Sequence, residues 1–175
     1  QRPGETQVEI RAGESFFTLH SLPAADFPQL PVFSGDGFTI DKAAFIETVD
    51  RVASSASRDE TRPVLTGVFI QLNTESVRMV ATDSYRLSVK ETAVESSVAE
   101  TLQAIVPART LLELSRIAGS AADTTLKIIP SENQILFQVA GISLISRLID
   151  GQFPNYRQLI PDTFDYEVAV DHDEL

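Results

Sequence analysis

The spacing of apolar residues predicts an amphipathic helix in the first half of the chain. Phe45, Val49 and Val52 recur at positions i, i+4 and i+7, which lie on one face of an α-helix. Asp41 precedes them at a position suited to a helix N-cap, where a short acidic side chain accepts a backbone N–H bond. We therefore expect a helix over about 41–54.

A second stripe with the same spacing follows later. Leu111, Leu114 and Ile117 form its apolar face, Pro107 suits the first helical position, and Gly119 suits the end. The two predicted helices begin 66 positions apart. The unit that contains them therefore divides into two halves of similar length.

Short apolar runs between polar turns predict strands before and after each helix. Each half reads as one strand, one helix and then three strands, beginning with 38–41 in the first half. Many antiparallel strands with only two helices favour an α+β fold over a parallel α/β sheet. The other expected strands are 8–11, 16–22, 64–72, 77–82, 86–91, 103–106, 125–129, 134–140 and 143–148.

A longer repeat connects the two ends of the chain. An apolar run, a short acidic turn and a Phe-Pro pair occur at 16–28 and again at 144–154, with the Phe-Pro pairs 126 positions apart. Likewise 38–41 and 168–171 have similar sequences, 130 positions apart. A domain-sized period indicates tandem similar domains rather than a solenoid of small repeats. We expect a fragment with one full unit, the end of the preceding unit and the start of the next.

Composition narrows the class of protein. The chain is 43% hydrophobic and 22% charged, values typical of a soluble globular protein. It has no cysteine, and His20 and His172 are isolated, so no disulfide and no metal-spaced cluster is expected. No apolar run approaches the roughly 18 residues that span a bilayer. We expect a cytoplasmic protein without cofactors.

The net charge of −11 argues against nucleic acid unless the cations are gathered locally. Arg109 and Arg116 are seven positions apart on one face of the second helix, and Lys42 and Arg51 belong to the first. These residues are either a solvated surface with local ion pairs or a surface turned toward a polyanion, whose backbone it contacts without reading bases.

Four segments resemble the bacterial DNA polymerase III beta subunits, the sliding clamps, in order and spacing. They are LPAADFP at 22–28, RPVLTGV at 62–68, VATDSYRL at 80–87 and FPNYRQLIP at 153–161. The resemblance extends over essentially the whole chain. It implies the DNA clamp fold, in which a pseudo-twofold domain packs two helices on antiparallel sheets.

The resemblance also implies an architecture and partners. Residues 1–31 would end the first clamp domain, 36–161 would form the second, and 162–175 would be a linker and the start of the third. The whole protein would be a homodimeric ring around double-stranded DNA, with Lys42, Arg51, Arg109 and Arg116 facing the duplex. It would tether the replicative polymerase alpha subunit, the clamp loader and repair polymerases through their clamp-binding peptides.

The family binds such extended peptides, which carry apolar anchors, in a groove between the second and third domains. Many relatives have Gly-His where this chain has Ser84 and Tyr85, and a basic residue at Gln158. The resemblance assigns to the groove, from this chain, Leu65, Thr82, Ser84, Tyr85, Arg86, Leu87, Pro154, Gln158 and Leu159. The residues alone also allow 81–87 to be no more than a turn between strands.

Two other classes of function compete with a clamp. An enzyme would have to use Asp83-Ser84 or the carboxylates Glu47, Asp50 and Asp59, but no histidine accompanies the serine in a recognisable arrangement. Phosphate-loop and metalloprotease motifs are also missing from the sequence. A β-rich protein-interaction module unrelated to DNA is the second alternative, and a clamp-binding peptide discriminates it from a clamp.

Overall fold

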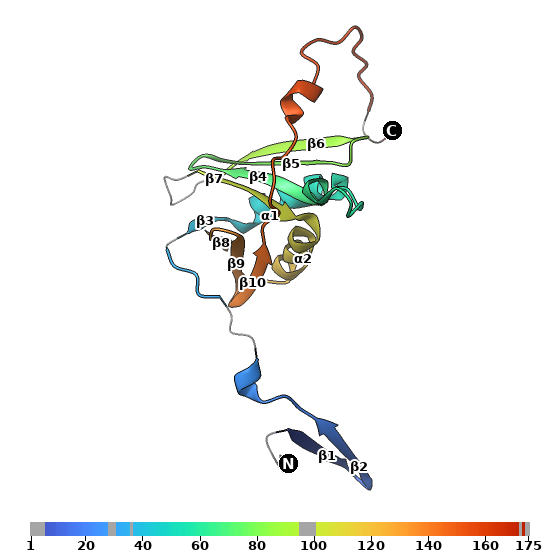
Figure 1. Ribbon diagram of the computed structural model, residues 1–175. Helices are drawn as coiled ribbons and strands as arrows, with labels where there is room; N and C mark the ends of the chain where they lie inside the picture. The colour runs from blue at the N-terminus through green and yellow to red at the C-terminus, as the bar shows by residue number, and fades with distance from the viewer. Residues whose placement is uncertain (1–5, 28–30, 36, 95–100, 172, 174–175) are drawn as a thin grey trace. The chain divides into compact units, whose positions relative to one another are not determined.

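A computed structural model describes residues 6–27, 31–35, 37–94, 101–171 and 173 (Figure 1). The chain divides into two units, residues 1–32 and 33–175. Pro28, which belongs to the sequence repeat, and the Ser/Glu-rich stretch at 95–100 lie outside the described residues.

The smaller unit is a β-hairpin followed by a single 3-10 turn. Strands β1 (Gln7–Ala12) and β2 (Ser15–His20) pair antiparallel through six residue pairs, from Gln7 with His20 to Ala12 with Ser15. Gly13 opens the two-residue loop at a φ of +61°, a conformation that glycine adopts without steric cost. The expected strand 16–22 ends at His20, two residues earlier than the sequence predicted.

The larger unit consists of two halves with the same order of elements, which confirms the predicted repeat. In each half one strand leads into a helix, and three strands follow. The first half contains β3 (Phe38–Asp41), α1 (Lys42–Val52), β4 (Gly67–Leu72), β5 (Ser76–Thr82) and β6 (Leu87–Ala93). The second contains β7 (Leu102–Pro107), α2 (Ala108–Gly119), β8 (Thr125–Pro130), β9 (Gln134–Val139) and β10 (Ile142–Arg147).

The two halves exchange their first strands. The sheets have the orders β10-β9-β8-β3 and β6-β5-β4-β7, so β3 joins the strands of the second half and β7 joins those of the first. Phe38 lies opposite Ile128, and Gly67 lies opposite Pro107. All neighbouring strands are antiparallel. This exchange produces the pseudo-twofold α+β arrangement expected from the sequence.

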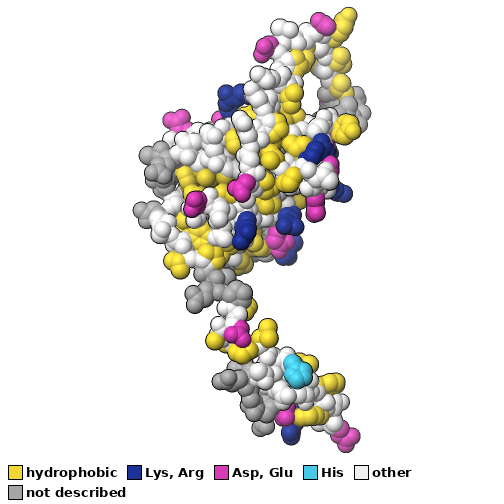
Figure 2. Space-filling view, in the orientation of Figure 1, with side chains coloured by type: hydrophobic (Ala, Val, Ile, Leu, Met, Phe, Trp, Pro, Cys, Tyr) yellow, Lys and Arg dark blue, Asp and Glu magenta, His cyan; other side chains and the backbone are white. Residues whose placement is uncertain are grey.

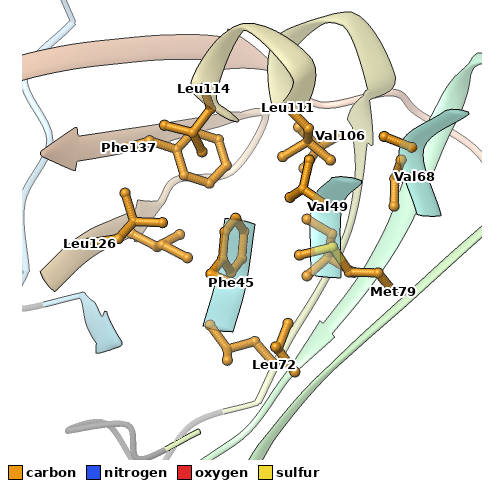
Figure 3. Packing of buried hydrophobic residues seen from close by; sticks show 14 of the residues in the cluster. Phe45, Val49, Val68, Leu72, Met79, Val106, Leu111, Leu114, Leu126 and Phe137 are labelled. Atoms are coloured by element: carbon orange, nitrogen blue, oxygen red, sulfur yellow. The ribbon is translucent and has the colours of Figure 1, made fainter. Parts of the chain in front are cut away.

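One hydrophobic core joins both helices to both sheets (Figure 3). Phe45 of α1 meets Phe137 of β9 with ring centroids 6.2 Å apart and the planes tilted by 49°. Leu111 and Leu114 of α2 are fully buried in the same space. Because apolar burial is the main favourable term in folding, the helices and sheets are stabilised as one structure.

The start of each helix explains where the chain changes direction. Asp41 is the N-cap of α1, and its Oδ1 accepts a 2.7 Å bond from the Ala44 N–H, as predicted. Pro107, expected as the first helical residue, is instead the N-cap of α2 and the last residue of β7. The ψ of Pro107 is 128°, an extended backbone conformation, so the helix begins one residue later, at Ala108.

The expected strand 64–72 is wrong over its first three residues. Pro63–Thr66 form a 3-10 helix, and only Gly67–Leu72 form the strand β4. Pro63 has no N–H to donate to a ladder, while the Leu65 N–H bonds locally to the Arg62 carbonyl at 3.0 Å. The local bonds outweigh the apolar pattern of this segment.

The hairpin β9–β10 has the same construction as β1–β2. Its strands are also six residues long, its loop also has two residues, and its residues follow those of β1–β2 at a constant offset of 127. Val139 pairs with Ile142, as Ala12 pairs with Ser15. The domain-length repeat in the sequence therefore corresponds to the same local structure in the hairpins β1–β2 and β9–β10.

The end of the larger unit is extended. A 3-10 helix η4 covers Tyr156–Leu159, and residues 162–171 form no helix or strand. The segment 168–171, similar in sequence to β3, therefore is not a strand here. In the part of the chain that the structure describes, every helix is too short or too polar to cross a membrane.

Candidate functional site: a sheet face and a helix face

The face of β6-β5-β4-β7 that turns away from the helices carries its own apolar row. Strand alternation sends Val68 and Ile70 of β4 into the main core, while Phe69 points to the opposite face. Val80 of β5 lies opposite Phe69 and Val89, and Ile105 of β7 lies opposite Phe69 on its other side. A row of apolar side chains thus crosses all four strands of this sheet, and we call it the outer face.

The segment after β10 covers part of the outer face. Phe153 stacks on Phe69 with ring centroids 5.3 Å apart and planes 12° from parallel. Phe153 and Tyr156 are both buried and form a second cluster with Val80 and Ile105. Aromatic pairs of this kind stabilise beyond the area they bury. The cluster therefore fixes residues 153–156 on the sheet.

A glycine permits this close approach. Gly67 begins β4, and a Cβ there would collide with the side chains of Ile105 and Ile149. The Ile149 N–H donates a 2.9 Å bond to the Ile105 carbonyl at the same place. The sequence segment RPVLTGV at 62–68 thus contains a position where only glycine lets the covering segment join the edge of β7.

The turn between β5 and β6 is held by its own polar groups. The Thr82 hydroxyl donates to the Arg86 carbonyl at 2.8 Å and accepts from the Ser84 N–H at 3.1 Å. Asp83 accepts from the Tyr85 and Arg86 N–H groups through Oδ1 and pairs with the Arg86 guanidinium through Oδ2 at 3.0 Å. These bonds make 82–86 an ordered turn, as the alternative interpretation of the sequence also required.

The ordered turn has an electrostatic consequence. Backbone hydrogen bonds, from Tyr85 first, and the Arg86 guanidinium hold the pKa of Asp83 below its ordinary value. The same guanidinium donates a 2.7 Å bond to the Ser54 carbonyl beyond the end of α1. Arg86 is therefore engaged on two sides, while its side chain stays largely exposed.

The structure brings only some of the groove residues assigned by resemblance to one place. Leu87 packs against the cluster of Phe153 and Tyr156, and Pro154 lies on the rim of a cavity of about 350 Å³ beside Phe69. Leu65 is buried in the 3-10 helix Pro63–Thr66, outside that cluster. Thr82 is buried under the turn.

The other assigned residues are exposed. Tyr85 is 97% exposed and Leu159 is 63% exposed, and Ser84, Arg86 and Gln158 also lie at the surface. An exposed rim of large side chains beside a buried apolar cluster is a surface on which a peptide with apolar anchors can bury area. This assignment of peptide contacts stays a prediction.

Several residues of this surface were missed in the sequence. Phe69, Val80, Ile105 and Tyr156 form its base. For Phe69 and Ile105 the available signal was their alternation with core residues in 67–72 and 102–107. Arg78 and Glu91 form an ion pair at 2.5 Å in the next row of the same face. The Arg78 hydrogen bond lowers the pKa of Glu91, and Ser76 adds a second bond.

Three of the four basic residues expected to face DNA, Arg51, Arg109 and Arg116, are exposed on the helices. Arg109 and Arg116 lie on one exposed stripe of α2, opposite the buried leucines, as the spacing predicted. Arg116 pairs with Glu113 through two of its guanidinium nitrogens, Nε and Nη2, while Arg109 makes no ion pair within the described residues. Figure 2 shows acidic side chains interspersed with basic ones on the visible face, so no continuous basic field is present there.

Lys42 has a different environment from the other three cations. Its ammonium donates to the carbonyl of Ala118, in the last turn of α2, at 3.0 Å and to that of Ala121, just beyond the helix, at 2.7 Å. A cation at a helix C-terminus interacts favourably with the helix dipole. A DNA-facing role for Lys42 stays a prediction, and it would require this ammonium to leave the carbonyls.

Arg51 is exposed in the last turn of α1, near Glu47. Glu47 itself pairs with Lys90 at 2.6 Å, and that hydrogen bond is the main reason why its pKa lies below the ordinary value. Arg58 was not singled out in the sequence. It shares with Arg109 the wall of a cavity of about 710 Å³ at the start of α2.

Three comparisons with known proteins decide the family. Residues 39–155 match the family model of the DNA polymerase III beta subunit, central domain. The chain belongs to the DNA polymerase III beta subunit family. The identity expected from the sequence motifs is thereby confirmed, and the repeated halves are those of a sliding clamp domain.

Relatives and solved structures agree. The chain is 33% identical to the beta sliding clamp of Micrococcus luteus over an alignment of 168 positions, which covers 94% of this chain and 54% of that protein. It is 36% identical to the beta sliding clamp of Streptomyces coelicolor over an alignment of 178 positions, gaps included, which covers 97% of this chain and 47% of that protein. A crystal structure of the DNA polymerase III subunit beta from Pseudomonas aeruginosa superposes with a TM-score of 0.80 at 30% identity, covering 94% of this chain and 45% of the other. The chain thus spans about half the length of the clamps it matches.

Proposed function

We propose that this chain is the central part of a bacterial sliding clamp, which encloses duplex DNA and holds replication proteins through a peptide groove. The observation that carries this proposal is the second apolar cluster. Phe69, Phe153 and Tyr156 build it, and two of the groove residues assigned by resemblance, Leu87 and Pro154, lie beside it. A clamp needs such a surface next to a fold that can repeat around a ring.

The repeat supports the assignment of domains. The hairpin β1–β2 has the construction of β9–β10, so residues 1–31 act as the end of a preceding clamp domain. Residues 36–161 then form the second domain, and 162–175 a linker and the start of a third. On this proposal the whole protein closes as a homodimeric ring.

The charge distribution suits enclosure rather than tight binding. Arg51 and Arg109 are exposed on the helices and free of described hydrogen bonds, while the chain as a whole carries a net charge of −11. Few phosphate contacts give weak, salt-sensitive and sequence-independent binding. A ring retains DNA by topology, so weak contacts from Arg51, Arg109, Arg116 and Lys42 are sufficient.

The proposed partners are extended peptides with apolar anchors. The replicative polymerase alpha subunit, the clamp loader and repair polymerases carry them, and the chain itself catalyses no reaction and needs no cofactor. We place the protein in the cytoplasm. Leu87 and Pro154 supply the apolar slot, and the exposed Tyr85 and Leu159 supply a rim that closes over the peptide.

A nitrogen-15 NMR titration of the chain with a Gln-Leu-x-Leu-Phe peptide tests the groove. We expect shifts centred on 82–87 and 153–159, and none with a peptide of the same composition in scrambled order. Shifts elsewhere, or no shifts, would contradict the proposed peptide groove.

A second experiment tests the mode of DNA binding. The 175-residue chain alone should not encircle DNA, so its complex with an end-blocked duplex should dissociate as salt is raised. A complex that resists salt on blocked duplex would contradict this part of the proposal. Repeatable nuclease or nucleotidyl transfer turnover by the pure chain would contradict the absence of catalysis.

A further inference from the structure

Ser84 has a backbone conformation that is unusual for its residue type. Its φ is +83°, and only Ser84 and Ala140 among the described non-glycine residues have a positive φ. A residue with a Cβ is disfavoured there, because the Cβ approaches the following carbonyl. Such a conformation persists only where the surroundings determine it.

A side chain from another segment contacts Ser84. The Arg62 Nη1 donates a 2.9 Å hydrogen bond to the Ser84 hydroxyl oxygen, and the Arg62 Nε pairs with Asp59 at 3.1 Å. Asp59 is fixed in turn by the N–H and hydroxyl of Thr61, at 3.0 and 2.6 Å. The guanidinium is therefore oriented before it reaches the turn, and we call Arg62 with Ser84 the brace.

The turn is also held from its other end. Arg86 bonds to the Ser54 carbonyl and to Asp83, so both ends of the turn are tied to the segment that follows α1. Between these ties the Tyr85 side chain is 97% exposed, while its N–H is bonded to Asp83. The backbone is fixed, and the ring remains free for a contact with another molecule.

We propose that Arg62 and Ser84 are positioning residues for peptide binding. They keep the turn in one conformation, so that the Tyr85 ring and Leu87 meet the peptide without a cost for ordering the turn. Preorganisation of this kind increases affinity by reducing the entropy lost on binding. The inference rests on the proposed peptide groove and names two residues that shape it without being in the apolar slot.

Three variants of the full chain test the brace. Ser84→Ala and Arg62→Gln each remove the hydrogen bond, and Ser84→Gly removes it while making the positive φ favourable. We expect each to weaken binding of the Gln-Leu-x-Leu-Phe peptide about three- to tenfold, the range of one hydrogen bond. The double variant Arg62→Gln with Ser84→Ala should bind no more weakly than either single one, because both remove the same contact.

Measuring the stability of the variants distinguishes a positioning role of Arg62 and Ser84 from a merely structural one. Ser84→Gly should be at least as stable as Ser84→Ala in urea unfolding, yet should lose as much affinity. Hydrogen exchange of the Tyr85 and Arg86 amides should become faster in all three variants without any peptide. Arg147→Gln, a change of the same kind at an exposed position on the other sheet, should alter neither exchange nor binding.

The outcomes distinguish the brace from the groove. If the unmodified chain binds the peptide but the three variants bind within about twofold of it, the brace is overturned and the groove stands. If affinity falls only in proportion to stability, the positioning role is also overturned. If the unmodified chain gives no shifts at all, the groove and the brace fail together.

Discussion

Phe153 lies flat on Phe69, ring centroid 5.3 Å from ring centroid, on the side of the sheet that faces away from both helices. The contact joins β4, in the first half of the repeat, to the segment that follows the last strand of the second half. Pro154 and Leu159, which we assign to the groove, depend on it, because they belong to the same covering segment. The stack therefore connects the stability of the fold with the shape of the surface that we assign to peptides.

Replacing Phe153 by alanine should damage both properties. We expect the free energy of unfolding to fall by about 3 kcal/mol, the cost of deleting a buried aromatic ring. Peptide binding should fall with it, since the slot loses its base. Urea denaturation and the NMR titration measure the two effects on the same samples.

Phe164→Ala is the matched control, because Phe164 is 73% exposed and lies in the extended end of the chain. That change should leave the free energy of unfolding within about 0.5 kcal/mol. A Phe153→Ala protein as stable as the unmodified chain would show that the aromatic stack does not anchor the segment.

The sequence predicted the order of elements because helices and strands here follow their hydrophobic periods closely. It placed Asp41 correctly as an N-cap, and it missed the 3-10 helix at 63–66, where local bonds at a proline override an apolar run. The outer face was harder to predict. Its base uses Phe69 and Ile105 from strands whose other side chains form the main core, and no local pattern shows which residues will cover the second side.

The environment of Lys42 was equally invisible in the sequence. Its partners lie 76 and 79 positions away, so helix spacing alone made it a surface cation. Replacement by methionine keeps the apolar stem but removes a charged donor from two carbonyls. We expect a loss of about 2 kcal/mol in the free energy of unfolding, as for hydrogen bonds to charged groups.

Arg51→Met provides the comparison for Lys42→Met in the same urea experiment. Arg51 is exposed and makes no described hydrogen bond, so its replacement should change the free energy of unfolding by no more than about 0.5 kcal/mol. Equal effects of the two substitutions would refute the assignment of Lys42 as a cap of α2.

Acid should destabilise the larger unit through its paired carboxylates. The pKa of Glu91 is lowered from its ordinary 4.5, first by the Arg78 hydrogen bond and then by Ser76. A carboxylate with a lowered pKa in the folded state stabilises at pH values above its unfolded pKa, and this contribution is lost as pH falls through the folded value. Stability should therefore be level near neutrality and decline below about pH 4.5.

Glu91→Gln should flatten part of that decline, because the variant has no proton to gain at this position. Denaturation midpoints in urea at several pH values from neutrality down to about pH 3 measure the slope. Glu132→Gln, at an exposed position in the turn between β8 and β9, is the control and should keep more of the slope. Identical slopes for Glu91→Gln and the unmodified chain would mean that the Arg78 pair contributes nothing to acid sensitivity.

The contrast between Arg109 and Arg116 predicts an order of effects on DNA. Both lie on the exposed stripe of α2, but Arg116 is held by Glu113 through two nitrogens, whereas Arg109 has no described partner. Arg116 must break its ion pair with the Glu113 carboxylate before it binds a phosphate, so Arg109→Gln should weaken binding to a short duplex more than Arg116→Gln.

Removing one phosphate-binding cation should reduce the slope of log affinity against log salt by about one. Titrations at several salt concentrations measure that slope, with Arg147→Gln on β10 as the control. A larger loss of affinity for Arg116→Gln than for Arg109→Gln would contradict this order. It would show that the ion pair with Glu113 does not reduce the contribution of Arg116 to DNA binding.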